Sequence, residues 1–513
     1  MATIPNSQNF PQFSQADIIS EMKKVSNIDI SDFRFYPAIQ NRPNEIIKIE
    51  SEENGIVLTF GTVARKALLS YTHETSLHLY KPADATVDTL YLHINIWTDD
   101  IFRVVFSKEK KISNPFSGLP ENARMLIAKP EKVEFTLDET ENKITLTTSK
   151  TEITVDKKTT RISAKFIDGK EFYSQKKQDF RTGDIHDLAL ADSDNDYACF
   201  EALELESDEI IYGLGERFDS LTRNGRTVDF HNKDAVGTTS RRAYINIPFY
   251  LSTKGYGLFL NSGAKTDWQI ATTDLSALQF AVLDSQLDYF VIGGKTPKDI
   301  IKGYCTLTGF SKLPPLWSFG LWMSRNSYVS WDVVDDIAKK VRENDIPCDV
   351  LHLDTAWFNR DWNCDLKFSE ERFPNPEENI DRYKKDGFKI SLWQYNFIPP
   401  NDDNEHYHEA VKYGYLSKDK DGNPYQLPET CQGSWVKDVT IDFSNPDACK
   451  WYADKIKELI KLGACAIKTD FGEGIAEDAV YQNIDGKHFH NLYSLDYNGV
   501  DFDATKSGSG ENT

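Results

Sequence analysis

The hydrophobic pattern of this chain changes its period once, near the Leu-Pro-Pro segment at 313–315. Before that point, apolar residues alternate with polar residues in one short segment after another, for example at Val133, Phe135 and Leu137. A period of two is typical of antiparallel strands that have one face in water. After that point, short apolar segments alternate with amphipathic segments of helical period. The sequence therefore predicts a β-rich part followed by an α/β part with a parallel sheet.

The β-rich part carries further strand signals. Apolar runs suited to strands occur at 89–97 and 256–262, and the polar segment at 138–143 separates two apolar runs as a hairpin loop does. We interpret residues 31–300 as a β-sandwich domain. Residues 1–30 are then an N-terminal extension.

The α/β part has a regular order of strands and helices. Its predicted strands are residues 317–322, 349–354, 388–393 and 464–470. Ser330 is a candidate N-cap for the first helix, and Gly463 is a candidate C-cap for the helix before the fourth strand. Residues 395–445 are too many for a simple loop, so we expect an inserted subdomain there. Residues 301–513 together form the predicted α/β domain.

Composition restricts the class of partner. The chain has 59 lysines and arginines against 80 aspartates and glutamates, and this net charge of −21 disfavours binding to nucleic acid or to an anionic membrane surface. No apolar run reaches the roughly 18 residues of a membrane-spanning helix, and the N-terminus has no signal-peptide pattern. The seven cysteines are scattered and form no CxxC pair. We therefore expect a cytoplasmic protein with reduced thiols.

Sequence patterns for cofactors and metals are weak. The YGLG segment at 212–215 contains Gly-x-Gly but lacks the third glycine of a dinucleotide site. His406 and His408 form a pair two residues apart, as do His488 and His490, and neither pair has a clear third ligand. We predict neither a cofactor nor a metal ion.

The carboxyl ends of the predicted parallel strands carry acids and tryptophans. Asp354 and Trp357 follow the second strand, and Trp393 ends the third. Lys468 and Asp470 end the fourth. In a parallel α/β sheet these ends meet at one face, where ligands bind. Carboxylates accept hydrogen bonds from sugar hydroxyls, and indole faces pack against sugar C–H groups. The alternative is that the aromatic side chains are core and the acids cap helices, and the pattern leaves both interpretations open.

The segment KTDFGEG at 468–474 makes the pattern specific. Together with other segments, it resembles the retaining α-glycosidases of glycoside hydrolase family 31 from about residue 200 onward. The other segments are YGLGERFDSL (212–221), NIPFY (246–250), WSFGLWMSRNSY (317–328), HLDTAWF (352–358), KISLWQ (389–394) and IDFSNPDA (441–448). The resemblance implies a galactose-mutarotase-like β-sandwich, followed by a (β/α)8 TIM barrel with an insert after its third strand.

The resemblance also implies roles for individual residues. Asp470 matches the nucleophile, which attacks the anomeric carbon and forms a covalent glycosyl-enzyme intermediate. Lys468 lies two residues earlier on the same strand face, where its charge favours the ionised aspartate. Asp354 matches an acid that binds sugar hydroxyls, and Trp393 matches a wall of the sugar pocket. Further candidates for lining the pocket are Trp357, Phe358, Phe471 and Asn326.

The sequence departs from the family in its last part. The family's acid/base carboxylate comes after an Arg-Ser-Ala stretch and near a Trp-Gly-Gly-Asp motif, and neither occurs in this chain. Four barrel strands are recognisable where eight are needed, so we expect a partial barrel with an open edge strand. Glu473 is close to the nucleophile in sequence, but the sequence does not give its geometry. We expect hydrolysis to be impaired, because a positioned general acid typically contributes about 10²–10⁴-fold.

The resemblance indicates a retaining α-glycosidase that acts on α-xylosides of oligosaccharides. The HLDTAWF and KISLWQ segments look most like the xylosidase branch of the family. An α-glucosidase is the first alternative, since one extra CH₂OH group changes selectivity by only about 1–3 kcal/mol. A non-catalytic sugar-binding remnant is the second alternative. The expected partner is an oligosaccharide or a small α-glycoside, and a homo-oligomer is compatible with the sequence.

Overall fold

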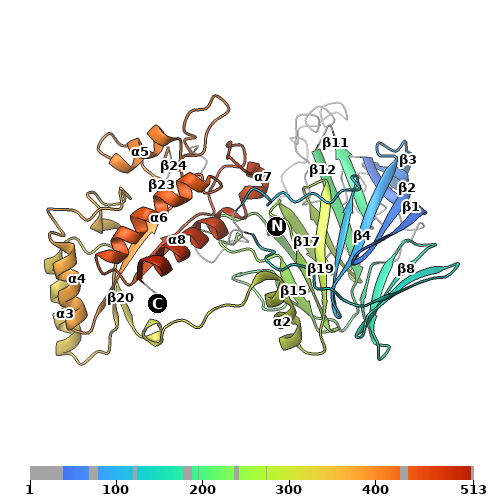
Figure 1. Cartoon of the computed structure of the whole chain (residues 1–513), viewed down its shortest axis with the longest axis horizontal. Helices are drawn as coiled ribbons and strands as arrows, with labels where there is room; N and C mark the ends of the chain where they lie inside the picture. Colours follow the sequence, from blue (N-terminus) through green and yellow to red (C-terminus); the bar gives the residue numbers. More distant parts are fainter. Residues whose placement is uncertain are drawn as a thin grey trace, which may run out of the picture.

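The structure, a computed structural model, describes residues 39–68, 79–119, 124–176, 188–193, 196–235, 242–272, 274–427 and 437–509. The predicted extension at 1–30 lies outside these residues. The described chain forms two lobes that lie side by side (Figure 1). One lobe is built from strands, and the other combines strands with helices.

The first lobe consists of two antiparallel sheets, as the alternating pattern predicted. The large sheet is fourteen-stranded, with β3 paired to β2 beside the main strand order. Its strands are β1 (Ile39–Glu52), β2 (Gly55–Leu68), β3 (Leu79–Ala83), β4 (Thr89–Thr98), β5 (Ile101–Ser107), β11 (Ala189–Ser193), β12 (Asp196–Glu204), β13 (Ile211–Gly213), β14 (Arg226–Phe230), β15 (Phe249–Ser252), β16 (Tyr256–Leu260), β17 (Thr266–Ile270), β18 (Ala277–Val282) and β19 (Gln286–Gly293). The small sheet contains β6 (Thr136–Glu139), β7 (Lys143–Thr147), β8 (Thr151–Asp156), β9 (Ile162–Phe166) and β10 (Glu171–Ser174).

The two sheets share one hydrophobic core. Ile144 and Ile153 of the small sheet belong to the same buried cluster as Leu58 and Leu92 of the large sheet. The predicted hairpin is present, because β6 and β7 pair antiparallel with Glu139 opposite Ile144. The alternation does not place Leu137 in the core: its side chain is 40% exposed, because β6 is an edge strand of the small sheet and all four of its residues are exposed.

The second lobe contains a parallel sheet in the order β20-β21-β22-β25. These strands are β20 (Trp322–Ser324), β21 (Val350–Leu353), β22 (Lys389–Tyr395) and β25 (Ala466–Asp470). A helix follows each strand, namely α3 (Trp331–Glu343), α4 (Pro376–Lys385), α6 (Pro446–Lys461) and α8 (Tyr493–Ser509). This alternation is the βα order of a TIM barrel, with four strands in the described part of the chain.

The other short elements complete the two lobes. Between β22 and α6, the insert after the third barrel strand contains β23 (Phe397–Ile398), α5 (Glu405–Tyr413) and β24 (Val439–Thr440). The remaining elements are α2 (Pro297–Thr308), the 3₁₀ helices η2 (Leu316–Phe319) and η3 (Thr355–Trp357), and α7 (Gly486–Phe489). Helix α2 packs on the large sheet, where Ile300 and Leu307 share a buried cluster with Phe259 and Phe290.

Two local predictions in the second lobe are wrong. The predicted strand at 317–322 is mostly η2, because the Pro315 carbonyl accepts from Ser318 N–H and turns the chain, so that pairing with β21 begins only at Trp322. Ser330 does precede α3, but its side chain makes no capping hydrogen bond. The Trp331 N–H donates instead to the Arg372 carbonyl, a tertiary contact that local sequence cannot reveal.

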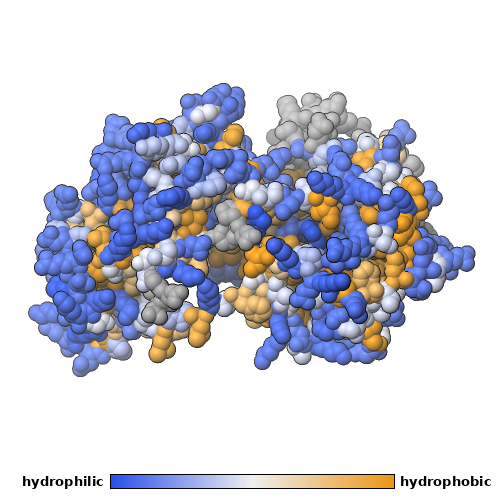
Figure 2. Space-filling view, in the orientation of Figure 1, coloured by the Kyte–Doolittle hydropathy of each residue, from blue (hydrophilic) through white to orange (hydrophobic). Residues whose placement is uncertain are grey.

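The parallel sheet ends in open edges. Every residue of β21 and all but the first residue of β22 are buried, whereas Trp322 of β20 is 36% exposed and β25 has no buried residue. The segment that leads into β20 exposes large apolar side chains, and apolar surface is visible at the lower edge of the molecule where this segment runs (Figure 2). These side chains are Phe310, Leu313, Leu316 and Phe319.

Residues around α7 join the lobes. The imidazole of His490 lies 2.8 Å from the Asn232 carbonyl, and Lys487 and His488 form ion pairs with Asp196 and Asp284 of the first lobe. The barrel lobe is therefore anchored to the sandwich through α7 and the residue that follows it, in the segment between β25 and α8. A search of the described helices finds none with the length and apolarity to cross a membrane.

Candidate active site

The predicted site lies where neighbouring strands end. In the parallel register of β22 and β25, Trp393 pairs with Lys468, and Tyr395 pairs with Asp470. Side chains two residues apart on a strand point to the same face, so Lys468 and Asp470 share a face with Trp393. The sequence prediction placed these three residues together, and their contacts now show how they meet.

Asp470 is held by a donor from each strand. Its Oδ2 atom accepts a hydrogen bond of 2.7 Å from the indole Nε1 of Trp393 and lies 3.2 Å from Lys468 Nζ. Its Oδ1 atom accepts from the Phe471 backbone N–H at 3.2 Å. Charge-assisted hydrogen bonds of this kind are roughly twice as strong as neutral ones. The carboxylate is therefore fixed in orientation at the carboxyl end of the sheet.

The ion pair at the site is open to solvent. The side chain of Lys468 is 47% exposed and that of Asp470 is 34% exposed. An exposed pair of this kind contributes only about 0–1 kcal/mol to folding. The pair therefore matters little for stability, and its accessibility leaves both groups free to contact a ligand.

A tight turn ends β25 directly after Asp470. Phe471 has a φ of 60°, in the left-handed region, and Gly472 has a φ of 108°. A Cβ atom at Gly472 would lie 2.8 Å from the Ser494 hydroxyl of α8, so this position requires glycine. The Asp-Phe-Gly sequence thus stops the strand and points the Phe471 N–H at the carboxylate.

Asp354 directly follows β21, which pairs with β22 on the side away from β25. It caps η3 by accepting from the Thr355 N–H at 3.0 Å, and its Oδ2 lies 3.4 Å from His352 Nε2. Burial by itself would raise the pKa of Asp354, but the contacts with His352 and Thr355 and the charge of Lys468 hold that pKa below its usual value. Asp354 is therefore an acceptor for hydroxyl donors at the same end of the sheet.

The aromatic side chains form a support beneath the carboxylate. Trp393 is 1% exposed, and Trp362 contacts it edge-on with ring centroids 5.1 Å apart. Trp357 is completely buried, and its indole N–H donates to the Trp393 carbonyl at 2.8 Å. Trp393 therefore contacts Asp470 through its indole N–H. Trp357 binds the backbone of β22, the strand that carries Trp393.

The remaining candidates lie at different depths. Phe358 is fully buried beside Trp393, and Phe471, directly after Asp470, is partly exposed. Asn326 is exposed in the loop after β20, and none of the hydrogen bonds described above involves it. The described structure thus brings Asp470, Lys468, Trp393 and Asp354 together and leaves Asn326 outside this set.

Two residues near the site were not chosen as site residues from the sequence. Trp362, with a φ of 63°, is placed against Trp393 by an irregular loop whose shape no periodicity reveals. Glu473 is only 5% exposed, and burial raises its pKa to about 7, with further rises from the charges of Asp234 and Asp470. Its position three residues after Asp470 is visible in the sequence, but its burial is not.

Comparison with family models decides the family. The model for the TIM-barrel domain of glycosyl hydrolases family 31 matches residues 311–512. The model for the family 31 N-terminal galactose mutarotase-like domain matches residues 91–268. The chain belongs to glycosyl hydrolase family 31. The resemblance inferred from KTDFGEG and the other segments is confirmed, and so is the succession of a mutarotase-like β-sandwich and a partial TIM barrel.

Family 31 relatives of known activity match over part of their length. The α-xylosidase XylQ of Lactiplantibacillus pentosus is 37% identical over 60% of this chain, and an α-xylosidase of Emericella nidulans is 34% identical over 60%. α-Glucosidase 2 of Bacillus thermoamyloliquefaciens is 29% identical over 75%. This chain spans 40%, 39% and 47% of these relatives, respectively, which is less than half of each.

Solved structures of the family share the fold. A dextranase of Flavobacterium johnsoniae complexed with glucose aligns with a TM-score of 0.75 at 20% identity, covering 90% of this chain and 52% of that one. An α-xylosidase from a soil metagenome complexed with xylose aligns with a TM-score of 0.71 at 17% identity, covering 90% of this chain and 64% of that one. At these identities, the alignments show the architecture of the two lobes.

Proposed function

We propose that this chain carries the nucleophile and part of the sugar site of a retaining α-glycosidase that acts on α-xylosides. The observation that carries the proposal is the geometry of Asp470. Its carboxylate is one-third exposed at the end of β25 and is held by Trp393 and Lys468. A carboxylate that is fixed and still accessible suits in-line attack on an anomeric carbon.

The proposed reaction has two steps. In the first, a carboxylate oxygen of Asp470 bonds to the anomeric carbon while the glycosidic C–O bond breaks and the leaving oxygen departs. In the second, water replaces the carboxylate and releases the sugar with its configuration retained. Lys468 and Asp354 lie on the same end of the sheet, where they bind sugar hydroxyls as donor and acceptor.

The departure of the leaving oxygen determines how fast the first step proceeds. Retaining hydrolysis uses a second carboxyl group roughly 5–5.5 Å from the first to protonate that oxygen. Glu473 has a pKa of about 7 and is therefore partly protonated near neutral pH, but its side chain is almost completely buried. We assign Glu473 to support of the nucleophile loop. Without a general acid, the 513-residue chain cleaves substrates with good leaving groups, which depart without a proton, faster than other substrates.

The preference for α-xylosides rests on the relatives. The two α-xylosidases match at 37% and 34% identity, above the 29% of the α-glucosidase, although the α-glucosidase match covers more of this chain. Xylose lacks the CH₂OH group of glucose, and one such group is worth about 1–3 kcal/mol of selectivity. We therefore expect a preference of about tenfold to hundredfold.

The test compares leaving groups and sugars on the purified chain. Dinitrophenyl α-xyloside is expected to release its phenol faster than an alkyl α-xyloside by about 10²-fold or more, because the alkyl group needs general-acid assistance. The matching α-glucoside is expected to react more slowly. Asp470→Asn is expected to abolish phenol release, and Glu371→Gln, a change at an exposed position in another loop, serves as the control. Binding of xylose with no reaction of either xyloside would favour a non-catalytic sugar-binding role, and faster reaction of the glucoside would favour an α-glucosidase.

A further inference from the structure

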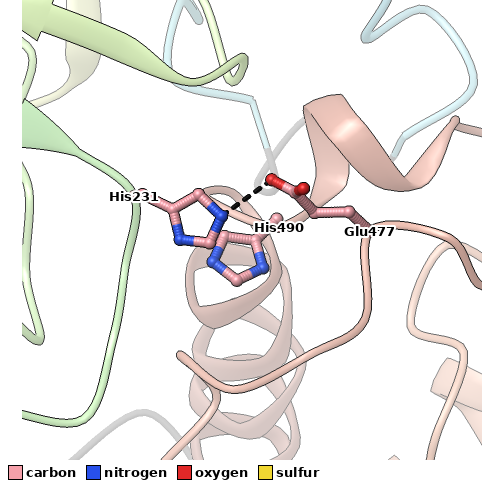
Figure 3. A group of neighbouring side chains, drawn as sticks. All are labelled: His231, Glu477 and His490. Carbon is pink, nitrogen blue, oxygen red and sulfur yellow. Dashed lines mark hydrogen bonds and ion pairs between the residues drawn. The ribbon is translucent and has the colours of Figure 1, made fainter. Parts of the chain in front are cut away.

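Three side chains of metal-ligand type meet at the junction of the two lobes (Figure 3). His231 follows β14 of the sandwich, Glu477 lies in the loop after β25, and His490 follows α7. One ligand atom from each residue lies within 4.8 Å of the others. The rings of His231 and His490 are 4.0 Å apart between centroids, and His231 Nε2 lies 2.8 Å from Glu477 Oε1.

Both ring nitrogens of His490 face backbone carbonyl oxygens, and a neutral imidazole can donate a hydrogen bond to only one of them. Nδ1 lies 2.8 Å from the Ile475 carbonyl, and Nε2 lies 2.8 Å from the Asn232 carbonyl. A neutral imidazole has a single N–H, so one of these nitrogens turns its lone pair toward a carbonyl oxygen. A cation placed next to this nitrogen and this carbonyl oxygen would accept a lone pair from each atom. Two ligands of one tetrahedral zinc ion, each about 2.1 Å from it, are about 3.4 Å apart, so the nitrogen and the carbonyl oxygen would separate by about 0.6 Å to bind the same ion.

His231 presents one ring nitrogen to Glu477 and buries the other. Its Nδ1 is buried and has no hydrogen-bond partner among the residues that the structure describes. A buried polar nitrogen without a partner is costly, because it loses its hydrogen bond to water and gains nothing in return. Because Nδ1 points away from Glu477, an ion shared with Glu477 would bind His231 through Nε2, in place of the 2.8 Å hydrogen bond between Nε2 and Glu477 Oε1.

We propose that His231, Glu477 and His490 bind one divalent transition-metal ion, with zinc as the ion whose preferred ligands they match. Two imidazole nitrogens and one carboxylate oxygen form a common zinc ligand set, and the carbonyl beside the binding nitrogen of His490 supplies the fourth ligand. Atoms up to 4.8 Å apart must move inward by less than about 1 Å to meet one ion. Because His231 comes from the sandwich and the other two ligands from the barrel lobe, the ion clamps the lobes together.

The clamp is independent of the glycosidase proposal, since none of its ligands contacts Asp470 in the contacts described above. This ligand set could not be predicted from the sequence, because its members are far apart along the chain. His231 and Glu477 are 246 residues apart. Of the histidine pair at 488 and 490, only His490 belongs to the ligand set, because both ring nitrogens of His488 bond to Asp284 and Asp485.

The test measures zinc on the full 513-residue chain, purified without a polyhistidine tag and treated with a chelator. Titration with zinc chloride followed by gel filtration and elemental analysis is expected to give one zinc per chain and a higher melting temperature. His231→Gln and Glu477→Gln are each expected to weaken zinc binding by about tenfold or more. His488→Gln, which removes an interlobe histidine outside the ligand set, is the matched control and is expected to keep the zinc.

Cobalt gives a second measurement that does not depend on stability. Co²⁺ bound to the unsubstituted chain is expected to show a visible absorption band that is lost in Glu477→Gln and kept in His488→Gln. The proposal is overturned if the chain retains no zinc after gel filtration, or if His231→Gln and Glu477→Gln bind zinc as tightly as the unsubstituted chain. In the latter case the metal is held elsewhere, for example by the free cysteines.

Discussion

The sandwich and the barrel lobe differ in how their sheets end. In the sandwich, the inward side chains of two antiparallel sheets bury one another, and the core residues Trp268 and Leu58 are fully inaccessible. In the described part of the barrel lobe, the parallel sheet has four strands, and β20 and β25 each have a neighbour on one side only. Asp470, the proposed nucleophile, ends one of these two strands, β25. The sandwich core is therefore closed by two facing sheets, whereas in the barrel lobe Asp470 lies on a strand that is itself an edge of the sheet.

The largest expected difference between the lobes is the cost of losing a large side chain. Trp268 is completely buried and stacks on Phe280 with centroids 4.5 Å apart, so Trp268→Ala is expected to cost about 3–5 kcal/mol. Trp322 lies on the open edge and is 36% exposed, so Trp322→Ala is expected to cost about 1 kcal/mol. Calorimetric unfolding of both variants measures the difference, and equal losses would show that the barrel edge is as well covered as the sandwich core.

A buried acid in the barrel lobe gives the second effect. Asp496 of α8 is completely buried, and both of its carboxylate oxygens lack a hydrogen-bond partner among the described residues. Burial raises its pKa to about 8, and nearby Asp442 adds to the rise. Between pH 4 and pH 8 the unfolded chain is ionised at this position while the folded chain holds a proton. Stability therefore falls as the pH rises through this range.

Asp496→Asn removes this pH dependence. We expect the variant to gain on the order of 3 kcal/mol relative to the unsubstituted chain at pH 8 and little at pH 4. The sandwich offers a contrast in Glu201, which is also buried but accepts hydrogen bonds from Gln175, Tyr289 and the Ala202 N–H. Glu201→Gln is expected to gain less, because it disturbs those bonds. Melting temperatures from pH 5 to pH 8 test both, and a pH profile unchanged by Asp496→Asn would contradict the account.

The third effect concerns the hydrogen bond that Trp393 donates to Asp470, the proposed nucleophile. Trp393→Phe keeps the ring but removes the N–H that Asp470 accepts at 2.7 Å. A hydrogen bond to a charged group is worth about 1.5–3 kcal/mol, so the first chemical step is expected to slow by about tenfold to hundredfold. Trp357→Phe removes the N–H bonded to the Trp393 carbonyl and serves as the control, with a loss of stability and a smaller loss of rate. Equal rates for both variants would show that the Trp393 N–H does not act on Asp470.

The smallest effect concerns surface charge. Lys468→Met is expected to change the free energy of unfolding by less than about 1 kcal/mol, because the pair with Asp470 is exposed. Lys150→Met in the sandwich removes a comparably exposed pair with Asp100 and is expected to change it as little. The two variants are expected to differ in activity: Lys468→Met loses activity because Lys468 lies at the candidate site, and Lys150→Met does not. A large loss of stability in Lys468→Met alone would mean that the pair has a structural role.

Much of the fold follows from local sequence, and the exceptions have tertiary causes. The hairpin at 138–143 and the end of α6 near Gly463 were predictable, because turns and caps depend on neighbouring residues. The start of β20 was not, because it depends on pairing with β21. The capping of α3 was not, because a carbonyl of a distant loop binds the Trp331 N–H.

The site shows the same division. Asp470, Lys468 and Asp354 were predictable because parallel strands bring their carboxyl ends together. The direction of the Trp393 N–H, the burial of Glu473 and the approach of His231 to Glu477 depend on packing between segments. No spacing in the sequence encodes these contacts, so the sequence identifies the reactive groups but not the groups that support them.

The most direct test of the central claim is the identification of the residue that becomes glycosylated. The 513-residue chain is treated with 5-fluoro-α-xylosyl fluoride, whose fluoride leaves without a proton and whose ring fluorine slows the second step by destabilising positive charge at the anomeric carbon. Peptide mass spectrometry then locates the label. The account predicts one fluoroxylosyl group on the peptide that contains Asp470 and none in Asp470→Asn. A label on another residue, or an unlabelled Asp470 peptide, would contradict it.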